Sequence, residues 1–175
     1  MKKFFTLFAI AILSACETTP IPEEPEPPMP EENTTQTLEL ALVAVDDNGQ
    51  SGELIGCGDS IVFVEKTVAD APTEELIQTA LEELFDIEDS LYGESGLYNA
   101  LAPSDVTVDS VTVNGSDVEV VLSGSIISAG TCDDPRIEQQ IRKTIEANLP
   151  PTSNVTVLFD GADLNEYFDM SGGQE

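Results

Sequence analysis

Two segments with an apolar stripe at helical spacing constrain the fold of this chain more than any other feature. The first covers residues 73–85 and the second covers residues 134–149. Apolar residues recur every three or four positions, so each segment predicts a helix with one face to bury. These residues are Leu76, Ile77, Ala80, Leu81 and Leu84 in the first segment and Ile137, Ile141, Ile145 and Leu149 in the second. Each stripe needs a matching apolar surface, and a β-sheet offers one.

The remaining apolar segments have the patterns of strands, either alternating or continuously apolar. They cover residues 38–45 and 61–68 before the first helix, 106–113 and 118–122 between the helices, and 155–159 after the second helix. Asn114-Gly115 tolerates positive φ and predicts a hairpin turn. The apolar phase changes after Val108, which predicts a bulge near Asp109-Ser110.

The expected order of elements is β-β-α-β-β-α-β, which indicates an α+β fold. We expect a two-layer domain in which a mixed sheet of about five strands has both amphipathic helices packed on one face. The domain is expected to cover residues 38–168, and residues 169–175 are expected to form a polar tail.

The start of the chain has the three parts of a secretory signal. Met1-Lys2-Lys3 is basic, residues 4–13 are mostly apolar, and Leu13-Ser14-Ala15-Cys16 ends the segment with small residues before a cysteine. The apolar run is shorter than the roughly 20 residues that span a bilayer. We interpret residues 1–15 as a lipoprotein signal peptide with a lipobox, and Cys16 as the residue that is acylated, for example with palmitate. The alternative is an ordinary signal peptide in which Cys16 has no role.

Residues 16–37 predict an extended spacer after the lipid site. Proline fixes φ and removes a donor, and like charges repel, so this segment is not expected to collapse. Its prolines, which lie among glutamates and threonines, are Pro20, Pro22, Pro25, Pro27, Pro28 and Pro30. The spacer would hold the domain away from a membrane to which the lipid anchors it. We expect the protein on the extracytoplasmic side of the cell membrane or the outer membrane.

The chain is strongly acidic, with 34 Asp and Glu against 6 Lys and Arg and a formal net charge of −28. Such a surface repels nucleic acid and anionic lipid head groups, so neither is an expected partner. It attracts divalent cations or a basic partner, although solvation or adaptation to salt explains the charge more simply. Two acidic loops, Asp46–Glu53 and Asp86–Glu94, offer an alternative function in binding a cation or small ligand. The first loop lacks the full ligand set of a calcium loop, and we assign no metal ligands.

Two cysteines remain when Cys16 is lipidated. Cys57 and Cys132 form an even pair in an oxidising compartment, and both lie in glycine-containing loops. We expect a disulfide between them, the alternative being two free thiols. Closing so long a loop would stabilise the fold by roughly 4 kcal/mol in the chain-entropy treatment.

No group of residues predicts an active site. The sequence has no histidine and no C-x-x-C pair, which argues against thiol redox chemistry. Acidic residues are so abundant that no carboxylate pair stands out for hydrolysis. Only Lys66 and Lys143 could act as a base for a serine nucleophile in the chain after the signal peptide. We therefore expect a protein that binds rather than catalyses and that uses no cofactor.

Four segments in a fixed order carry a family resemblance. They are VFVEKTV (Val62–Val68), the helical Thr73–Phe85, GLYNALAPSDVTVDSVTVNGSDVEVVLSG (Gly96–Gly124) and NVTVLFDGADL (Asn154–Leu164). Together they resemble the GerMN domain, which is named from a spore-germination protein and is common in bacterial lipoproteins and envelope proteins. The resemblance implies a non-enzymatic extracytoplasmic module, and we expect this module to interact with an envelope protein or cell-wall component. Some members of the family are linked to sporulation, germination or envelope assembly, so the resemblance makes such a role an expectation for this chain. The chain departs from the family pattern at Ser125–Asp133 and in the acidic loop Asp86–Glu94.

Overall fold

The structure of the protein is a computed structural model, and it describes residues 34–171. The lipobox with Cys16 and most of the spacer lie outside the described residues. The elements are β1 (Thr35–Ala44), β2 (Glu53–Leu54), a 3₁₀ turn (Gly56–Gly58), β3 (Ser60–Ala69), α1 (Thr73–Phe85), β4 (Asp105–Asn114), β5 (Asp117–Ser125), α2 (Asp133–Ala147), β6 (Asn154–Phe159), β7 (Ala162–Asp163) and α3 (Leu164–Ser171). No helix among these is both long and apolar enough to cross a bilayer.

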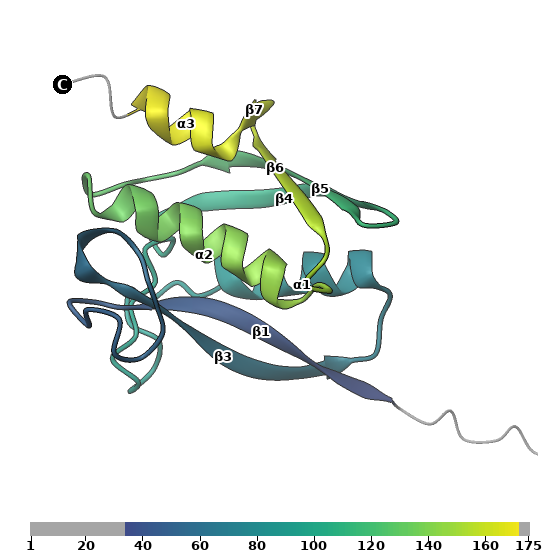
Figure 1. Cartoon of the computed structure of the whole chain (residues 1–175), viewed down its shortest axis with the longest axis horizontal. Coiled ribbons are helices and arrows are strands. Elements are labelled where there is room, and N and C mark those ends of the chain that lie inside the picture. The colour runs from purple at the N-terminus through teal and green to yellow at the C-terminus, as the bar shows by residue number, and fades with distance from the viewer. Residues whose placement is uncertain (1–33, 172–175) are drawn as a thin grey trace, which may run out of the picture. The chain divides into compact units, whose positions relative to one another are not determined.

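The strands form two sheets (Figure 1). In the first, of order β1-β3-β2, β1 and β3 pair antiparallel without a break from Thr35–Ala69 to Ala44–Ser60. In the second, of order β4-β5-β6-β7, β5 and β6 are parallel and are connected through α2. The α+β class is confirmed. The expected single mixed sheet of about five strands is wrong, and so is the exact order of elements, because β2, β7 and α3 were not predicted.

Helix α2 explains why β1 does not join the second sheet. Gln140, Thr144 and Asn148 recur every four residues along α2 and its C-terminal end, and we call them the α2 polar ladder. Thr144 Oγ1 accepts a hydrogen bond from the Ala41 N–H at 3.0 Å, and Gln140 Nε2 donates to the Ala41 carbonyl at 3.1 Å. Asn148 Oδ1 accepts from the Glu39 N–H at 3.0 Å, while its Nδ2 donates to the Glu39 carbonyl at 2.8 Å. Side chains thus occupy the edge of β1 where another strand would pair.

The loop before β4 extends this arrangement along the same edge. The backbone of Tyr98 exchanges two hydrogen bonds with Val43, at 3.0 and 2.7 Å. Gln140 is itself held there, since its Oε1 accepts from the Ala100 N–H and its Nε2 donates to Asn99 Oδ1. Gln140 and Thr144 have no exposed surface. Buried polar groups of this kind are stable only when their hydrogen bonds are made, as they are here.

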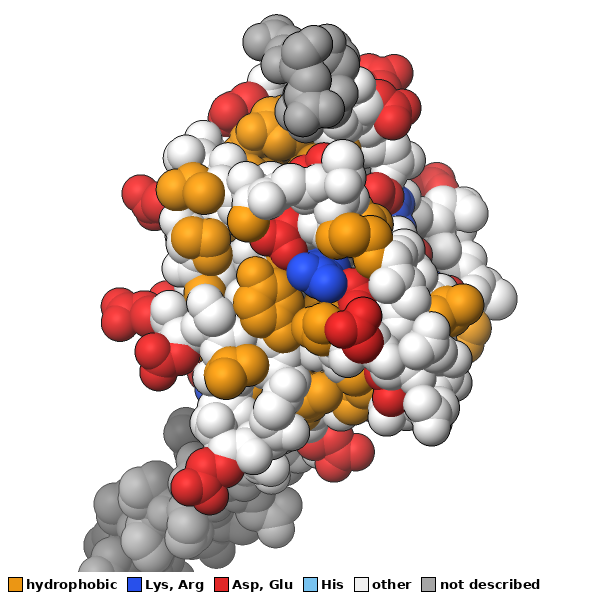
Figure 2. Space-filling model, turned by 90° about the vertical axis from the view of Figure 1, so that its left-hand side faces the viewer, with side chains coloured by type: hydrophobic (Ala, Val, Ile, Leu, Met, Phe, Trp, Pro, Cys, Tyr) orange, Lys and Arg blue, Asp and Glu red, His pale blue; other side chains and the backbone are white. Residues whose placement is uncertain are grey.

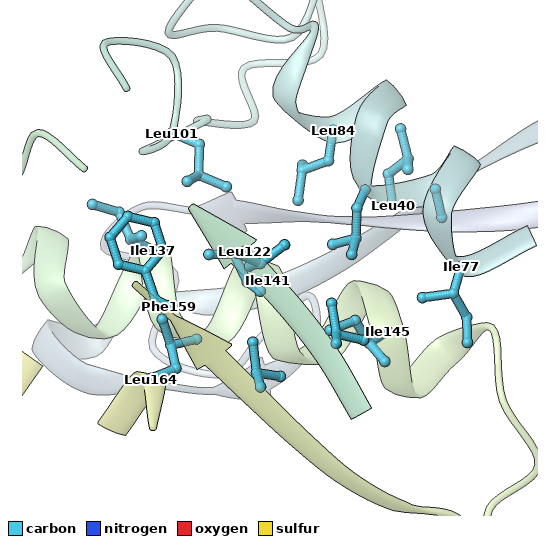
Figure 3. Close-up of a cluster of buried hydrophobic side chains, with 14 of the residues drawn as sticks. Leu40, Ile77, Leu84, Leu101, Leu122, Ile137, Ile141, Ile145, Phe159 and Leu164 are labelled. Carbon is cyan, nitrogen blue, oxygen red and sulfur yellow. The ribbon is translucent and has the colours of Figure 1, made fainter. Parts of the chain in front are cut away.

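Most apolar faces meet in a main core between the two sheets (Figure 3), and Ala41, Val43 and Ile61 form a smaller second cluster. Both helical stripes predicted from the sequence are largely buried in the main core. The strands contribute the fully or almost fully buried Leu38, Leu40 and Leu42 of β1, Val118, Val120 and Leu122 of β5, and Val157 and Phe159 of β6. Helix α1 contacts β1 and β4, and α2 contacts β1 and β6. Each helix therefore touches both sheets, which corrects the expectation that both pack on one face of one sheet.

Two finer expectations for the hairpin are met, and one helix was missed. The register of β4 and β5 shifts between Val108 and Ser110, as the change of apolar phase predicts. Gly115 has a φ of +66° in the turn that joins these strands, a conformation that glycine adopts readily.

Helix α3 was not predicted. Its buried Leu164 and Phe168, four residues apart, pack into the core.

Replacing Thr144 tests the α2 polar ladder. Thr144→Val keeps the shape of the side chain but leaves the buried Ala41 N–H without an acceptor. We expect the free energy of unfolding, measured by urea denaturation, to fall by about 1–3 kcal/mol. Thr144→Ser keeps the hydroxyl and loses one methyl group, so its loss should be nearer 0.8 kcal/mol. A valine variant as stable as the wild type would show that this hydrogen bond contributes nothing.

Candidate functional site

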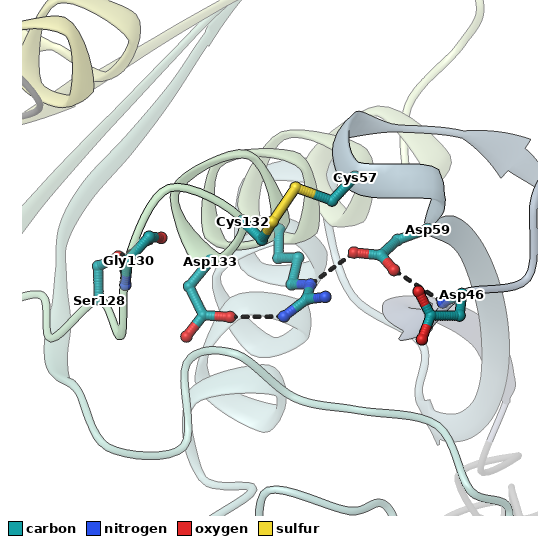
Figure 4. The surroundings of a disulfide bond; sticks show 8 residues. Asp46, Cys57, Asp59, Ser128, Gly130, Cys132 and Asp133 are labelled. Carbon is teal, nitrogen blue, oxygen red and sulfur yellow. Dashed lines mark hydrogen bonds and ion pairs between the residues drawn. A yellow bond between two sulfur atoms is a disulfide. The ribbon is translucent and has the colours of Figure 1, made fainter.

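A disulfide joins two loops at one end of the domain (Figure 4). Cys57 lies in the 3₁₀ turn after β2, and Cys132 immediately precedes α2. The two cysteines are 75 residues apart in the sequence, and their pairing is the one expected from the cysteine count. Cys57 has a φ of +61°, a left-handed conformation that is unusual for a residue other than glycine. The bond thereby ties the turn to the first residues of α2.

Arg136, in the first turn of α2, is the central charged group beside this disulfide. Its Nε donates to Asp59 Oδ2 at 2.6 Å, and its Nη1 donates to Asp133 Oδ1 at 2.8 Å. Figure 4 shows these two carboxylates on opposite sides of the guanidinium group. The Asp59 side chain is 0% exposed, and its other oxygen accepts from the Asp46 N–H at 2.9 Å. The hydrogen bond to Asp59 is the main cause that raises the pKa of Arg136. The buried carboxylate is therefore fully partnered, as a buried charge must be.

Tyr98 provides an aromatic surface for the same group. The Arg136 guanidinium lies 5.4 Å from the centre of the Tyr98 ring, within the range of a cation–π interaction. Burial raises the pKa of Tyr98, and the nearby Asp133 carboxylate raises it further. The backbone of Tyr98 is the segment that hydrogen-bonds to Val43 on the β1 edge. The position of the ring therefore depends on the same edge that α2 occupies.

These groups line a hollow of about 560 Å³. Figure 2 shows this face, with a basic group at its centre and acidic and hydrophobic side chains around it. The residues that define what we call the Arg136 hollow are Val45, Tyr98, Ala129, Gly130, Thr131, Cys132, Asp133 and Arg136. Its volume falls in the range of roughly 300–1,000 Å³ that is usual for ligand pockets. Val45 is 44% exposed at its rim, and Ile127, 52% exposed, lies two residues before Ala129. The hollow therefore offers apolar contact around a fixed guanidinium.

The two acidic loops that the sequence offers as a cation site are each held by internal hydrogen bonds. The Asp47 carboxylate accepts from the Ser51 N–H at 2.7 Å, from Ser51 Oγ at 3.0 Å and from Ser60 Oγ at 2.8 Å. The bond from the Ser51 backbone is the largest cause that lowers the pKa of Asp47. The backbone of the second loop, Asp86–Glu94, is tied to Asn99, which donates to it from its amide at 2.9 Å. Across residues 34–171, no three carboxylate or cysteine side chains are grouped so that they could hold a metal ion.

Every basic side chain from residue 34 to residue 171 is already paired with a carboxylate. Lys66 pairs with Glu83, and Arg136 pairs as described above. The remaining two belong to α2, where Arg142 lies 3.8 Å from Glu138 and Lys143 lies 2.9 Å from Glu53. The excess of acidic side chains over basic ones is therefore left without intramolecular compensation.

Sequence reasoning did not identify Arg136, Tyr98 and Asp59 as a group. They come from α2, from the loop before β4 and from the residue before β3, which are separated widely in the sequence. The available signal was a pair of cysteines, because the disulfide brings Gly56–Gly58 against the start of α2. Asp59 and Arg136 lie within four residues of Cys57 and Cys132 respectively.

Comparisons with known proteins identify a related fold. The tandem GerMN domains of the sporulation protein GerM from Bacillus subtilis match with a TM-score of 0.50 and 22% identity, over 73% of this chain and 40% of that chain. A candidate lipoprotein from Clostridium perfringens matches with a TM-score of 0.39 and 15% identity, over 72% of this chain and 76% of that chain. No family model and no curated protein matches the sequence. The described domain has a GerMN-like fold, and it spans less than half of the tandem GerM chain.

The disulfide is tested by counting thiols in the mature protein, denatured without reductant. We expect no thiol from Cys57 or Cys132 to react. Reduction should lower the free energy of unfolding by about 4 kcal/mol, because the closed loop no longer restricts the unfolded chain. Two reactive thiols in the unreduced protein would refute the pairing.

The ion pair is tested by a double-mutant cycle. Arg136→Met keeps an apolar stem but leaves the buried Asp59 carboxylate without its partner, and we expect a loss of about 3–5 kcal/mol in unfolding free energy. Adding Asp59→Asn removes the uncompensated charge and should recover at least about 1 kcal/mol. Strictly additive effects of the two substitutions would contradict a direct interaction.

Proposed function

We propose that the protein is a lipid-anchored extracytoplasmic module that binds a protein or cell-wall component of the cell envelope through the Arg136 hollow. The observation that carries the proposal is the hollow itself. It is a pocket of ligand size that combines exposed apolar side chains with a guanidinium held in place by two carboxylates. Binding sites typically pair such apolar surface with a few fixed polar groups. The disulfide at its wall keeps these loops together outside the reducing cytoplasm.

Membrane attachment is supported by the sequence before the domain. The basic start, the short apolar run and the small residues before Cys16 form a lipobox pattern. Several acyl chains on one cysteine anchor a protein durably, since each buried CH₂ contributes about 0.8 kcal/mol. The acidic spacer gives the domain reach beyond the membrane surface.

The chemistry of the hollow favours binding over catalysis. Its two charged side chains, Arg136 and Asp133, are bonded to each other, which holds the guanidinium group in a fixed position. A fixed guanidinium over an aromatic ring is suited to orienting a ligand. The GerMN-like fold, found in a protein of sporulation, supports a role in envelope assembly, sporulation or germination.

Lipid attachment is tested by labelling cells that produce the full chain with a palmitate analogue. We expect label and membrane association for the wild type, and loss of both for Cys16→Ser, because the thiol is the acylation site. Cys57→Ser is the matched control and should keep the label. An unacylated N-terminus by mass spectrometry, or a cytosolic protein with its leader intact, would overturn the anchor.

Binding through the hollow is tested by site-specific photocrosslinking in the cells that make the protein. A benzophenone side chain at Val45 should give a defined adduct with an envelope component on illumination. One at the exposed Thr112 of β4 should not. Thr131→Trp should fill the hollow and reduce the yield of the Val45 adduct at least about fivefold. A fivefold loss of affinity corresponds to about 1 kcal/mol of binding free energy. Equal adducts from both positions, or an adduct that Thr131→Trp leaves unchanged, would contradict the proposal.

A further inference from the structure

The edges of the two sheets differ in how well they are protected from pairing with another chain, and the outer edge of β3 is the least protected. The β1 edge is covered by the α2 polar ladder and by Tyr98. At the edges of the second sheet, β4 is interrupted by its bulge, and the two-residue β7 leaves only the short stretch Asn154–Val157 of β6 unpaired. Bulges and very short strands are common means of preventing an edge from pairing with another chain. The outer edge of β3 has neither device.

The free part of this edge runs from Val62 to Ala69. Strand β2 pairs only with the first two residues of β3, Ser60 and Ile61. Residues 62–69 contain no proline, glycine or bulge, and their pairing with β1 is continuous. Long unpaired edges of this kind are the sites at which extended segments add as new strands.

The hydrogen bonds of β1 reveal which backbone groups of β3 point outward. Ala41 and Glu39 direct their N–H and C=O groups toward α2, so they belong to non-hydrogen-bonded pairs with β3. Their partners are Phe63 and Glu65, and the same alternation includes Thr67. These three residues therefore direct their N–H and C=O groups away from β1. All three are exposed, and in residues 34–171 no backbone partner is seen for them.

The charge on this part of the sheet indicates what kind of segment fits. Glu39 and Glu65 lie directly opposite each other, and neither makes an ion pair within the described chain. Like charges in opposite positions of a sheet are destabilising. Phe63, two residues before Glu65 on the same face, is 41% exposed. A strand placed beside β3 would bring one side chain next to Glu65 and another next to Phe63.

We propose that the outer edge of β3 binds an extended segment of a partner protein in which basic and apolar residues alternate on one face. The segment adds to the sheet as a strand. A basic side chain opposite Glu65 compensates the Glu39–Glu65 pair, and an apolar side chain two residues along covers Phe63. A second copy of this chain fits poorly, because each copy has a formal charge of −28. This inference rests on the proposed function, since it gives the chemistry of a partner to a domain that works by binding.

The probe is the acetylated, amidated peptide KTVTKTVT, titrated into the mature protein and followed by amide chemical shifts and by calorimetry. We expect saturable binding below about 1 mM at low salt, with the largest shifts at Phe63, Glu65 and Thr67. The matched control is the same peptide N-methylated at its lysines and valines, which keeps the charge but removes the N–H groups that face β3. It should bind at least about tenfold more weakly, the equivalent of roughly 1.4 kcal/mol.

Two protein variants separate the strand edge from simple charge attraction. Thr67→Pro removes an outward N–H and blocks the edge without breaking the β1–β3 bonds or changing the charge, and it should weaken binding about tenfold. Thr67→Val should change binding less than about twofold, and Glu65→Gln should weaken it about threefold.

Equal binding of both peptides, or no binding of the first, overturns the proposal even if Thr67→Pro does not fold. Shifts confined to the Arg136 hollow would also overturn it. The adduct at Val45 reports on the hollow alone, so its presence or loss tests the proposed function separately from the β3 edge.

Discussion

The structure depends on how the free edge of β1 is satisfied. This strand buries Leu38, Leu40 and Leu42 in the core, and its outward N–H and C=O groups would be costly if left buried and unpaired. Helix α2 supplies the partners through the side chains of Gln140, Thr144 and Asn148. A helix thus takes the place of a neighbouring strand. The same helix buries its isoleucines against the core, so one element provides both apolar contact and hydrogen bonds.

This arrangement also builds the candidate site. Since α2 runs along β1, its N-terminus reaches the loops at one end of the sheet, where Cys132 is joined to Cys57. Arg136 is thereby placed between Asp59 and Asp133 and over Tyr98, whose backbone continues the coverage of the β1 edge. The other long edge of the same sheet, on β3, has no such cover within residues 34–171 and is open to a partner.

The sequence predicted most elements of this fold but not their assembly. The stripes of α1 and α2, the hairpin with its bulge and the α+β class follow from local periodicity, which depends only on which residues are apolar. The division into two sheets depends on Gln140 and Thr144, whose polar side chains lie outside the apolar stripe that the sequence analysis used. Only tertiary contact reveals that they face a strand edge. The Arg136 hollow could be predicted only in part: the cysteine pair brought its two loops together, but nothing local linked Tyr98 to them. Helix α3 is short and follows the Asp160-Gly161 turn, which was interpreted as the end of the last strand, so no element was predicted in the remaining part of the domain.

Amide hydrogen exchange of the free mature protein tests the central claim most directly, because it measures the two edges of the same sheet in one experiment. If α2 replaces a strand beside β1, the amides of Glu39, Ala41 and Val43 should exchange only on global unfolding. Those of Phe63, Glu65 and Thr67 should exchange orders of magnitude faster, since no backbone acceptor holds them within the described residues 34–171. Rapid exchange at Ala41 and Glu39, at rates similar to those of Phe63 and Glu65, would contradict the account.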